Sequence, residues 1–266
     1  LVMLPMAEWL VHFRPPGLAG FVRARNRIDA VVYRMIDAHR KSGVDRGSLL
    51  DLMLAASPAD NEESRQSLRD QVITIFLAGY ETVANALSWT WYLLSQNPDC
   101  EAKFQEEVDT VLTGRSPAFE DVSRLRYTEN VMAESLRLYP PAWAMGRYAL
   151  NDFALGDYFL PARTTVLISQ FVTHRDPRYF PAPLRFDPDR FSAEAKARRA
   201  KFTYFPFGAG ARQCIGESFA WMEGALILAT LAQKWKLRLV PEHPVEPQPL
   251  ITLRPKYGMR MVVEAR

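Results

Sequence analysis

The sequence predicts a mainly α-helical protein with small β-sheets, organised as a single domain over residues 1–266. Most segments that carry apolar residues at helical spacing lie before Pro140-Pro141. After this proline pair the apolar runs are short and bounded by turn residues, which is typical of strands. Because 48% of the residues are hydrophobic, a chain of 266 residues can bury a sizeable core.

The expected helices have recognisable start and stop signals. Gly43 lies just beyond the first helix, and Pro98 stops the second and starts the third. Gly114 and Pro140 end the third and the fourth, and the last helix follows a glycine-rich loop. These signals and the apolar spacing predict helices over about residues 21–41, 68–96, 98–113, 127–139 and 217–234.

Two of these helices raise the question of a membrane. The first has a basic face (Arg23, Arg25, Arg27, Arg34 and Arg40), for which a solvated surface is commoner than a membrane surface. In the second, residues 72–94 are mostly apolar and long enough to span a bilayer. Glu81 lies near the middle, where a charge would cost on the order of 3 kcal/mol in a membrane. We therefore expect a helix through the core of a soluble protein.

Short strands are expected after the proline pair. The predicted strands lie near 153–160, folded on a tight turn at Gly156, and near 164–171, 236–240, 250–253 and 259–263. Residues 177–191 are rich in proline and aromatic residues, which indicates an ordered meander. Residues 57–64 are expected to form a polar loop.

The composition excludes several classes of protein. The net charge is only +3, so nucleic acid is not an expected partner. Cys100 and Cys214 do not make a disulfide framework and suit a reducing compartment, and the four histidines show no metal-ligand spacing. The first residues lack the pattern of a signal peptide, so we expect the protein in the cytoplasm.

One loop carries most of the functional signal. Residues 207–216 read Phe-Gly-Ala-Gly-Ala-Arg-Gln-Cys-Ile-Gly and open into the last helix. The free N–H groups of a helix N-terminus favour a thiolate, which is the form of cysteine that binds metal. A dinucleotide-binding loop would need a third glycine where Gln213 stands. A lone cysteine such as Cys214 is usually a small buried hydrophobe. Here six positions of the ten-residue loop match one established cysteine-loop pattern, which favours a metal ligand.

The pattern F-G-x-G-x-R-x-C-x-G resembles the haem-binding loop of the cytochrome P-450 family. The resemblance implies a cytochrome P-450 fold and haem b (iron protoporphyrin IX) as the cofactor. Cys214 would be the axial ligand of the haem iron, and Phe207 would limit water on its thiolate side. The other implied cofactor-binding residues are Gly208 and Gly216 in the loop, and Arg212 and Arg147, which would hold the two haem propionates.

A second motif has a structural role in the family. Glu134 and Arg137 match its E-x-x-R pair, and Arg190 in Pro188-Asp189-Arg190-Phe191 matches a later turn, with Asp189 in place of glutamate. The resemblance implies a buried triad that locks the meander under the haem loop. The spacing alone means little, because Glu62 and Arg65 share it and most such pairs are exposed.

A third motif lies in the long helix. Gly79 costs about 1 kcal/mol there relative to alanine, which calls for an explanation. Residues 78–82 match the family's A-G-x-D/E-T, so Thr82 would hydrogen-bond dioxygen and Glu81 would relay protons. A core helix with a few satisfied polar groups is the alternative interpretation. The resemblance also places Leu77, Ala78, Pro141, Ala142 and Met145 in the wall of the substrate pocket.

The resemblance therefore implies a haem-thiolate monooxygenase that inserts one oxygen atom from O2 into an apolar organic substrate. A ferredoxin or a flavoprotein reductase would supply the electrons. Lys196, Arg198, Arg199 and Lys201 form either a solvated surface or a landing patch for such a donor. The chain corresponds to the C-terminal three-fifths or so of the family, so the N-terminal portion of the fold, with any membrane anchor, is expected to be absent. A non-catalytic haem-binding protein and a truncated, catalytically incompetent fragment remain open alternatives.

Overall fold

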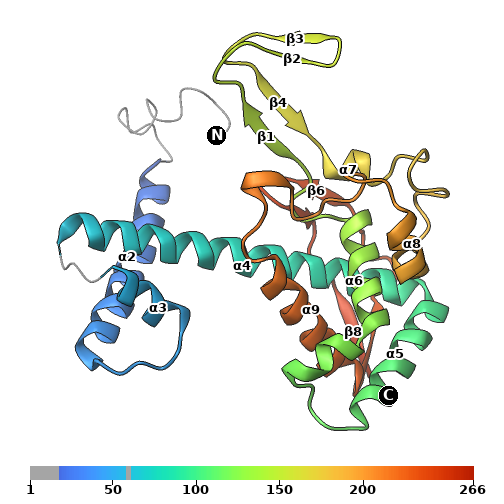
Figure 1. The fold of residues 1–266 in the computed structure, drawn as a ribbon. Coiled ribbons are helices and arrows are strands. Elements are labelled where there is room, and N and C mark those ends of the chain that lie inside the picture. The colour runs from blue at the N-terminus through green and yellow to red at the C-terminus, as the bar shows by residue number, and fades with distance from the viewer. Residues whose placement is uncertain (1–17, 58–60) are drawn as a thin grey trace. The chain divides into compact units, whose positions relative to one another are not determined.

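The computed structural model describes residues 18–57 and 61–266 (Figure 1). Its contacts divide the chain into two compact units, one ending at Ala78 and the other running from Gly79 to Arg266. Helices dominate, and the strands form small two-stranded sheets, which confirms the predicted fold class. The assignment of all 266 residues to a single domain stays a prediction.

The described part of the first unit, residues 18–57 and 61–78, contains three helical segments around a small apolar core. They are α2 (Leu18–Ser42), α3 (Leu49–Ala56) and the first part of α4 (Glu62–Gln96). The core brings together Val32 and Ile36 of α2, Leu50 of α3 and Leu68 of α4. Two ion pairs between α2 and α4 accompany it, Asp29–Arg69 and Asp37–Arg65.

Helix α3 was not predicted, and α4 begins earlier than expected. The Ser48 hydroxyl accepts from the Asp51 N–H, while the Asp51 carboxylate accepts from the Ser48 N–H, which together cap α3. The predicted loop 57–64 is wrong from Glu62 onward, because these residues form the first turn of α4. There the Asn61 side chain accepts from the Ser64 N–H at 2.8 Å. Residues 58–60 of that loop lie outside the described residues.

The second unit is built around α6. It contains the rest of α4 and the helices α5 (Pro98–Leu112), α6 (Arg126–Leu138), α7 (Gln170–Thr173), α8 (Ala193–Arg198) and α9 (Glu217–Ala232), with 3₁₀ turns η1 (Phe119–Arg124), η2 (Pro188–Phe191) and η3 (Gly210–Arg212). Helices α5 and α9 lie beside α6 (Figure 1). Val131, Met132 and Leu136 of α6 are buried among Phe104 of α5 and Leu228 of α9. The functional loop therefore leads into a helix that is fixed in the core.

Four antiparallel strand pairs complete the second unit. They are β1 (Met145–Tyr148) with β4 (Thr165–Ile168), β2 (Phe153–Leu155) with β3 (Tyr158–Leu160), β5 (Trp235–Leu239) with β8 (Met261–Ala265), and β6 (Pro247–Pro249) with β7 (Leu253–Pro255). The prediction for 164–171 is wrong beyond Ile168, since the Ser169 hydroxyl caps α7 by accepting from the Val172 N–H. The prediction for 250–253 is wrong before Leu253, because Leu250 to Thr252 form the turn between β6 and β7 and the strand begins at Leu253.

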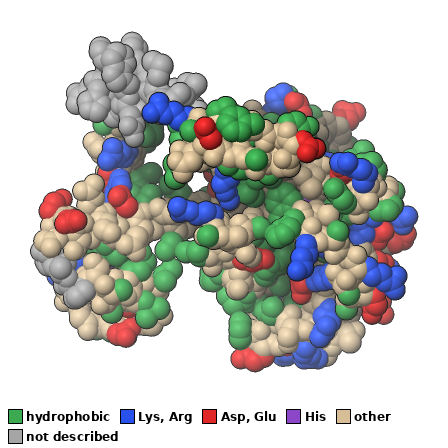
Figure 2. Space-filling view, turned by 45° about the horizontal axis from the view of Figure 1, so that its top comes forward, with side chains coloured by type: hydrophobic (Ala, Val, Ile, Leu, Met, Phe, Trp, Pro, Cys, Tyr) green, Lys and Arg blue, Asp and Glu red, His purple; other side chains and the backbone are tan. Residues whose placement is uncertain are grey.

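The long helix α4 does not qualify as a membrane span. Among the described helices, none combines the length and the hydropathy that crossing a bilayer requires. Apolar side chains nevertheless reach the surface in several places (Figure 2), as in the β2–β3 hairpin, where Tyr158 and Phe159 are exposed. Scattered exposure of this kind is normal for a folded protein.

The buried indole of Trp89 generates a stability prediction. Its ring stacks on Tyr139 with centroids 4.1 Å apart, and its Nε1–H donates to the Leu253 carbonyl at 3.1 Å. We expect W89F to lower the free energy of unfolding by about 2 kcal/mol, because the Leu253 carbonyl loses its indole donor in the core. The control W235F removes a 40% exposed indole and should change the free energy by less than about 0.5 kcal/mol. Equal shifts of the urea midpoint for both variants would contradict the packing described.

Candidate functional site

The loop before α9 is closed by its own backbone hydrogen bonds. The Cys214 N–H donates to the Phe207 carbonyl at 3.0 Å, and the Gly208 N–H donates to the Phe205 carbonyl at 3.0 Å. Gly208 and Gly210 have φ angles of +75° and +72°, in a region that residues other than glycine rarely adopt. The glycines therefore allow the chain to fold back so that Cys214 is presented just before the first turn of α9.

The Cys214 thiol is exposed, and so are large apolar side chains next to it in the chain. Ile215 is 95% exposed and Phe219 is 61% exposed. Gly216 caps the helix, and a Cβ atom there would lie 3.8 Å from the Cys214 sulfur. A sulfur ligand with apolar neighbours and no bulk at Gly216 fits a flat apolar group that carries a metal, as haem does.

Cys214 does not belong to a cluster of metal-binding side chains in the described part of the chain. Within residues 18–57 and 61–266, no cluster of three His, Cys, Asp or Glu side chains is placed to hold a metal ion. Cys100, the other cysteine, is half-buried, and burial raises the pKa of its thiol, so it is a poor metal ligand.

Strand β1 lies beside the cysteine loop. A Cβ atom built on Gly208 would come 3.5 Å from the Met145 methyl carbon, which places the start of β1 against the loop. Arg147, two residues further along β1, is exposed and donates to the Gly146 carbonyl. Arg212 is exposed at the end of η3. Both guanidinium groups are thus exposed to a ligand that carries carboxylates.

The structure brings Glu134, Arg137 and Arg190 together in the interior. The Arg137 guanidinium forms a fork with the Glu134 carboxylate, with N–O distances of 2.6 and 2.8 Å, and both side chains are fully buried. The Arg190 Nε lies 3.4 Å from the same carboxylate. Arg137 also donates to the carbonyl of His174, just after α7, and to the carbonyls of Pro183 and Arg185 in the meander. The pair therefore fixes the meander to α6.

The acid of the long helix has a partner far away in the sequence. Thr252 donates from its hydroxyl to Glu81 Oε1 at 2.7 Å, and Asn85 Nδ2 donates to the same hydroxyl at 3.2 Å. Thr82, the next residue in α4, has its hydroxyl 3.5 Å from the Gly79 carbonyl. No pattern in the sequence connected Glu81 with Thr252, which lies 171 positions away.

The residues predicted to wall the substrate pocket come from separate stretches of the chain, and their place in a pocket stays a prediction. Pro141 is buried, and its carbonyl accepts from the Leu253 N–H at 2.9 Å. Ala142 is exposed and Met145 is half-buried beside the cysteine loop. Leu77 and Ala78 belong to the first unit, and their place in the pocket stays a prediction.

Comparison with known proteins identifies the chain. The family model of cytochrome P450 matches residues 1–261. The chain belongs to the cytochrome P450 family. It is 43% identical over 251 residues to cyclooctatin synthase of Streptomyces melanosporofaciens, covering 92% of this chain and 54% of that protein. It is 41% identical over 228 residues to cyclooctat-9-en-7-ol 5-monooxygenase of the same organism, covering 85% of this chain and 50% of that protein.

Solved structures agree with this assignment. The crystal structure of a cytochrome P450, CYP102L1, superposes with a TM-score of 0.83 at 30% identity, covering 94% of this chain and 58% of that one. The haem domain of cytochrome P450DA gives 0.81 at 31% identity, with 90% and 54% covered. The predicted cytochrome P450 fold is thereby confirmed. The chain spans about half the length of the curated relatives it matches.

One contact that holds the cysteine loop in place was not predicted from the sequence. His174 is fully buried, and its Nε2 accepts from the Phe205 N–H at 2.9 Å, just before the cysteine loop. Its own carbonyl accepts from Arg137 at 2.8 Å, so His174 joins the buried ion pair to the loop. Burial, together with Arg137 and Arg199, lowers the pKa of His174 to about 3, which keeps the ring neutral and able to accept. The sequence placed His174 only as one of four scattered histidines.

The basic run before the loop differs from expectation. Arg199 is not a solvated residue: its guanidinium lies 4.2 Å from the Phe191 ring centroid and donates to the Arg190 carbonyl at 2.6 Å. Lys196 pairs with Glu129 at 2.6 Å. Arg199 is half-buried against the end of the meander, because aromatic faces attract a guanidinium. The interpretation as a solvated surface is therefore wrong for Arg199, and the landing patch stays a prediction.

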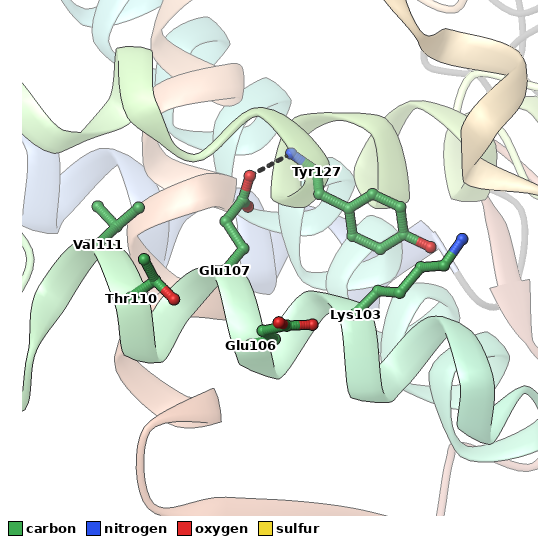
Figure 3. Close-up of a pocket in the computed structure, with 6 residues that line it drawn as sticks. All are labelled: Lys103, Glu106, Glu107, Thr110, Val111 and Tyr127. Carbon is green, nitrogen blue, oxygen red and sulfur yellow. Dashed lines mark hydrogen bonds between the residues drawn. The ribbon is translucent and has the colours of Figure 1, made fainter.

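A pocket of about 300 Å³ lies elsewhere, between α5 and the start of α6 (Figure 3). It is lined by Lys103, Glu106, Glu107, Thr110, Val111 and Tyr127. Its Glu107 carboxylate accepts from the Tyr127 N–H at 2.6 Å and from the Thr128 N–H at 2.8 Å. This acid caps α6, which is a structural task.

Truncating the buried pair tests its energetic role. We expect R137M to lower the free energy of unfolding by about 3–5 kcal/mol, because Glu134 is then buried without its counter-ion. The double variant E134L/R137M should lose less than R137M. The control K196M breaks an exposed pair and should cost less than about 1 kcal/mol. A double variant that is at least as unstable as R137M would contradict a penalty from the unpaired charge.

The neutral state of His174 predicts how stability depends on pH. Its folded pKa of about 3 lies below the ordinary value, so the unfolded chain takes up its proton first as the pH falls. The free energy of unfolding should therefore fall between pH 6 and pH 4, by about 2 kcal/mol more in the wild type than in H174Q. Gln keeps an acceptor for the Phe205 N–H without titrating. Identical pH profiles from urea unfolding would contradict a buried neutral His174.

Proposed function

We propose that the protein is a haem-thiolate monooxygenase, which inserts one oxygen atom from O2 into an apolar organic substrate. The observation that carries the proposal is the exposed Cys214 sulfur, presented by a closed glycine loop at the start of α9. The cofactor proposed is haem b. When held by a thiolate, haem supplies the oxygen activation, because the sulfur pushes electron density onto the iron and favours O–O cleavage.

The side chains of the loop have separate tasks in this proposal. The free N–H groups at the start of α9 stabilise negative charge on the Cys214 sulfur. Phe207 packs against Trp221, with ring centroids 5.5 Å apart, and would limit water on the thiolate side of the haem. Arg212 and Arg147 would hold the haem propionates, because a guanidinium matches a carboxylate in a charge-assisted fork. Gly208 lets the loop turn, and Gly216 leaves the space that a side chain would fill.

Glu81 and Thr82 are the proposed catalytic residues. Glu81 is exposed and Thr82 is half-buried, both on α4 just after the start of the second unit. A carboxylate can take up a proton from solvent, and an adjacent hydroxyl can pass one on at the reacting atoms. The two residues would thus supply protons while the rest of the pocket excludes water.

An apolar substrate is supported by the similar proteins and by the local surface. Two relatives are named for oxygenation of cyclooctat-9-en-7-ol and of pentalenene, an alkenol and an alkene by their names. The second of these, from Streptomyces avermitilis, is 37% identical over 236 residues. Leu250 and Ile251 expose apolar side chains in the turn between β6 and β7. This turn is attached to Pro141, whose carbonyl accepts from the Leu253 N–H. A ferredoxin or a flavoprotein reductase is the proposed electron donor.

The two cysteines give a matched test of the proposed ligand. We expect the haem-loaded full chain to show the strongly red-shifted Soret band of a thiolate ligand in its reduced, CO-bound difference spectrum. C100S should keep the band and C214S should lose it, since only Cys214 is exposed in the loop. A band that survives in C214S would contradict the assignment, and one that is lost in C100S would move the ligand to Cys100.

A further inference from the structure

One face of α4 reaches the turn between β6 and β7 at three successive levels. Glu81, Asn85 and Trp89 are spaced by four residues, so their side chains lie in one row along the helix. The first two contact the Thr252 hydroxyl, and the Trp89 indole N–H donates to the Leu253 carbonyl. The row therefore ties the middle of α4 to a turn near the other end of the chain.

The hydrogen bonds in this row have only one consistent direction. Asn85 Nδ2 donates to the Thr252 oxygen at 3.2 Å. A hydroxyl has a single hydrogen, and the Glu81 carboxylate can only accept when it is ionised. The Thr252 hydrogen must therefore point to Glu81 Oε1, 2.7 Å away. Asn85 thus fixes the orientation of the hydroxyl, and the hydroxyl fixes one oxygen of the acid.

Thr252 is itself held firmly. Its side chain is buried, with 7% of the residue exposed, whereas Glu81 is exposed. The Thr252 carbonyl accepts from the Leu250 N–H at 3.2 Å. The next residue, Leu253, is bonded through its N–H to the Pro141 carbonyl and through its carbonyl to Trp89. A buried donor on a fixed turn can hold an exposed carboxylate in one rotamer.

We propose that Thr252 is a positioning residue for the Glu81 carboxylate. It holds Oε1 in place and so directs Oε2 as the oxygen that exchanges a proton with solvent. Among the hydrogen bonds described for Glu81, the one from Thr252 goes to Oε1 and not to Oε2. The inference rests on the proposed role of Glu81 in proton supply and adds the residue that aims it.

The contact itself is tested by a double-mutant cycle. T252V removes the hydroxyl and E81A removes its acceptor. The wild type, the two single variants and the double variant are each unfolded in urea. We expect T252V to raise the equilibrium constant for unfolding about fivefold more in the wild type than in the E81A background. The conservative variant T252S should behave as the wild type. Equal effects of T252V in both backgrounds would overturn the inference.

A spectroscopic readout separates positioning from packing. The side-chain carboxyl carbon of Glu81, assigned by its loss in E81Q, should move its ¹³C resonance in T252V and stay unchanged in T252S. The control T230V removes a threonine hydroxyl that donates to its own helix at the Leu226 carbonyl, and it should leave the resonance unchanged. A Glu81 resonance that ignores T252V would also overturn the inference.

The functional arm uses the haem-loaded full chain with NADPH and a reductase, and measures NADPH oxidation without added substrate. E81Q and T252V should both slow it, T252V by about tenfold, because a general acid that is present but misdirected loses part of its effect. T252S should restore the rate. If E81Q has no effect, or the wild type oxidises no NADPH, the proposed function fails. If E81Q slows oxidation and T252V does not, only the role of Thr252 fails.

Discussion

The buried ion pair between Glu134 and Arg137 is the contact on which the second unit depends. Two full charges have been taken out of water, and this is tolerable only when every donor and acceptor is used. Here the guanidinium meets the carboxylate in a fork and also donates to three backbone carbonyls. The carboxylate accepts in addition from the Asp187 N–H at 2.9 Å. A segment with little regular structure is thereby attached to α6 by several hydrogen bonds.

The effect of this pair extends to the functional loop through His174. Arg137 fixes the His174 carbonyl, and the neutral ring of His174 accepts from the Phe205 N–H. Two residues later Phe207 accepts from the Cys214 N–H, which closes the loop. Tyr204 adds a second attachment by donating to the Ala133 carbonyl on α6 at 2.9 Å. The position of the cysteine sulfur is thus set from the interior of the protein, although the sulfur is exposed.

The sequence predicted what local spacing determines. The cysteine loop, the E-x-x-R pair and the acid–threonine pair each lie within a few residues, so their resemblance to the cytochrome P-450 family was visible in the sequence. The ends of the helices followed from proline and glycine. Contacts between distant segments were not predictable in this way. Thr252 meets Glu81 and His174 meets Phe205 only because the folded chain brings their elements together. Arg199 looked like surface charge because its stacking on Phe191 has no signature in composition.

The most direct test of this account is amide hydrogen exchange in R137K, which keeps a positive charge but cannot reproduce the fork and the carbonyl contacts. The account predicts faster exchange at the N–H groups of Phe205, Gly208 and Cys214, while the N–H groups in the β5–β8 pair keep their wild-type rates. Unchanged protection of the three loop amides in a folded R137K protein would contradict the claim that the buried pair sets the cysteine in place.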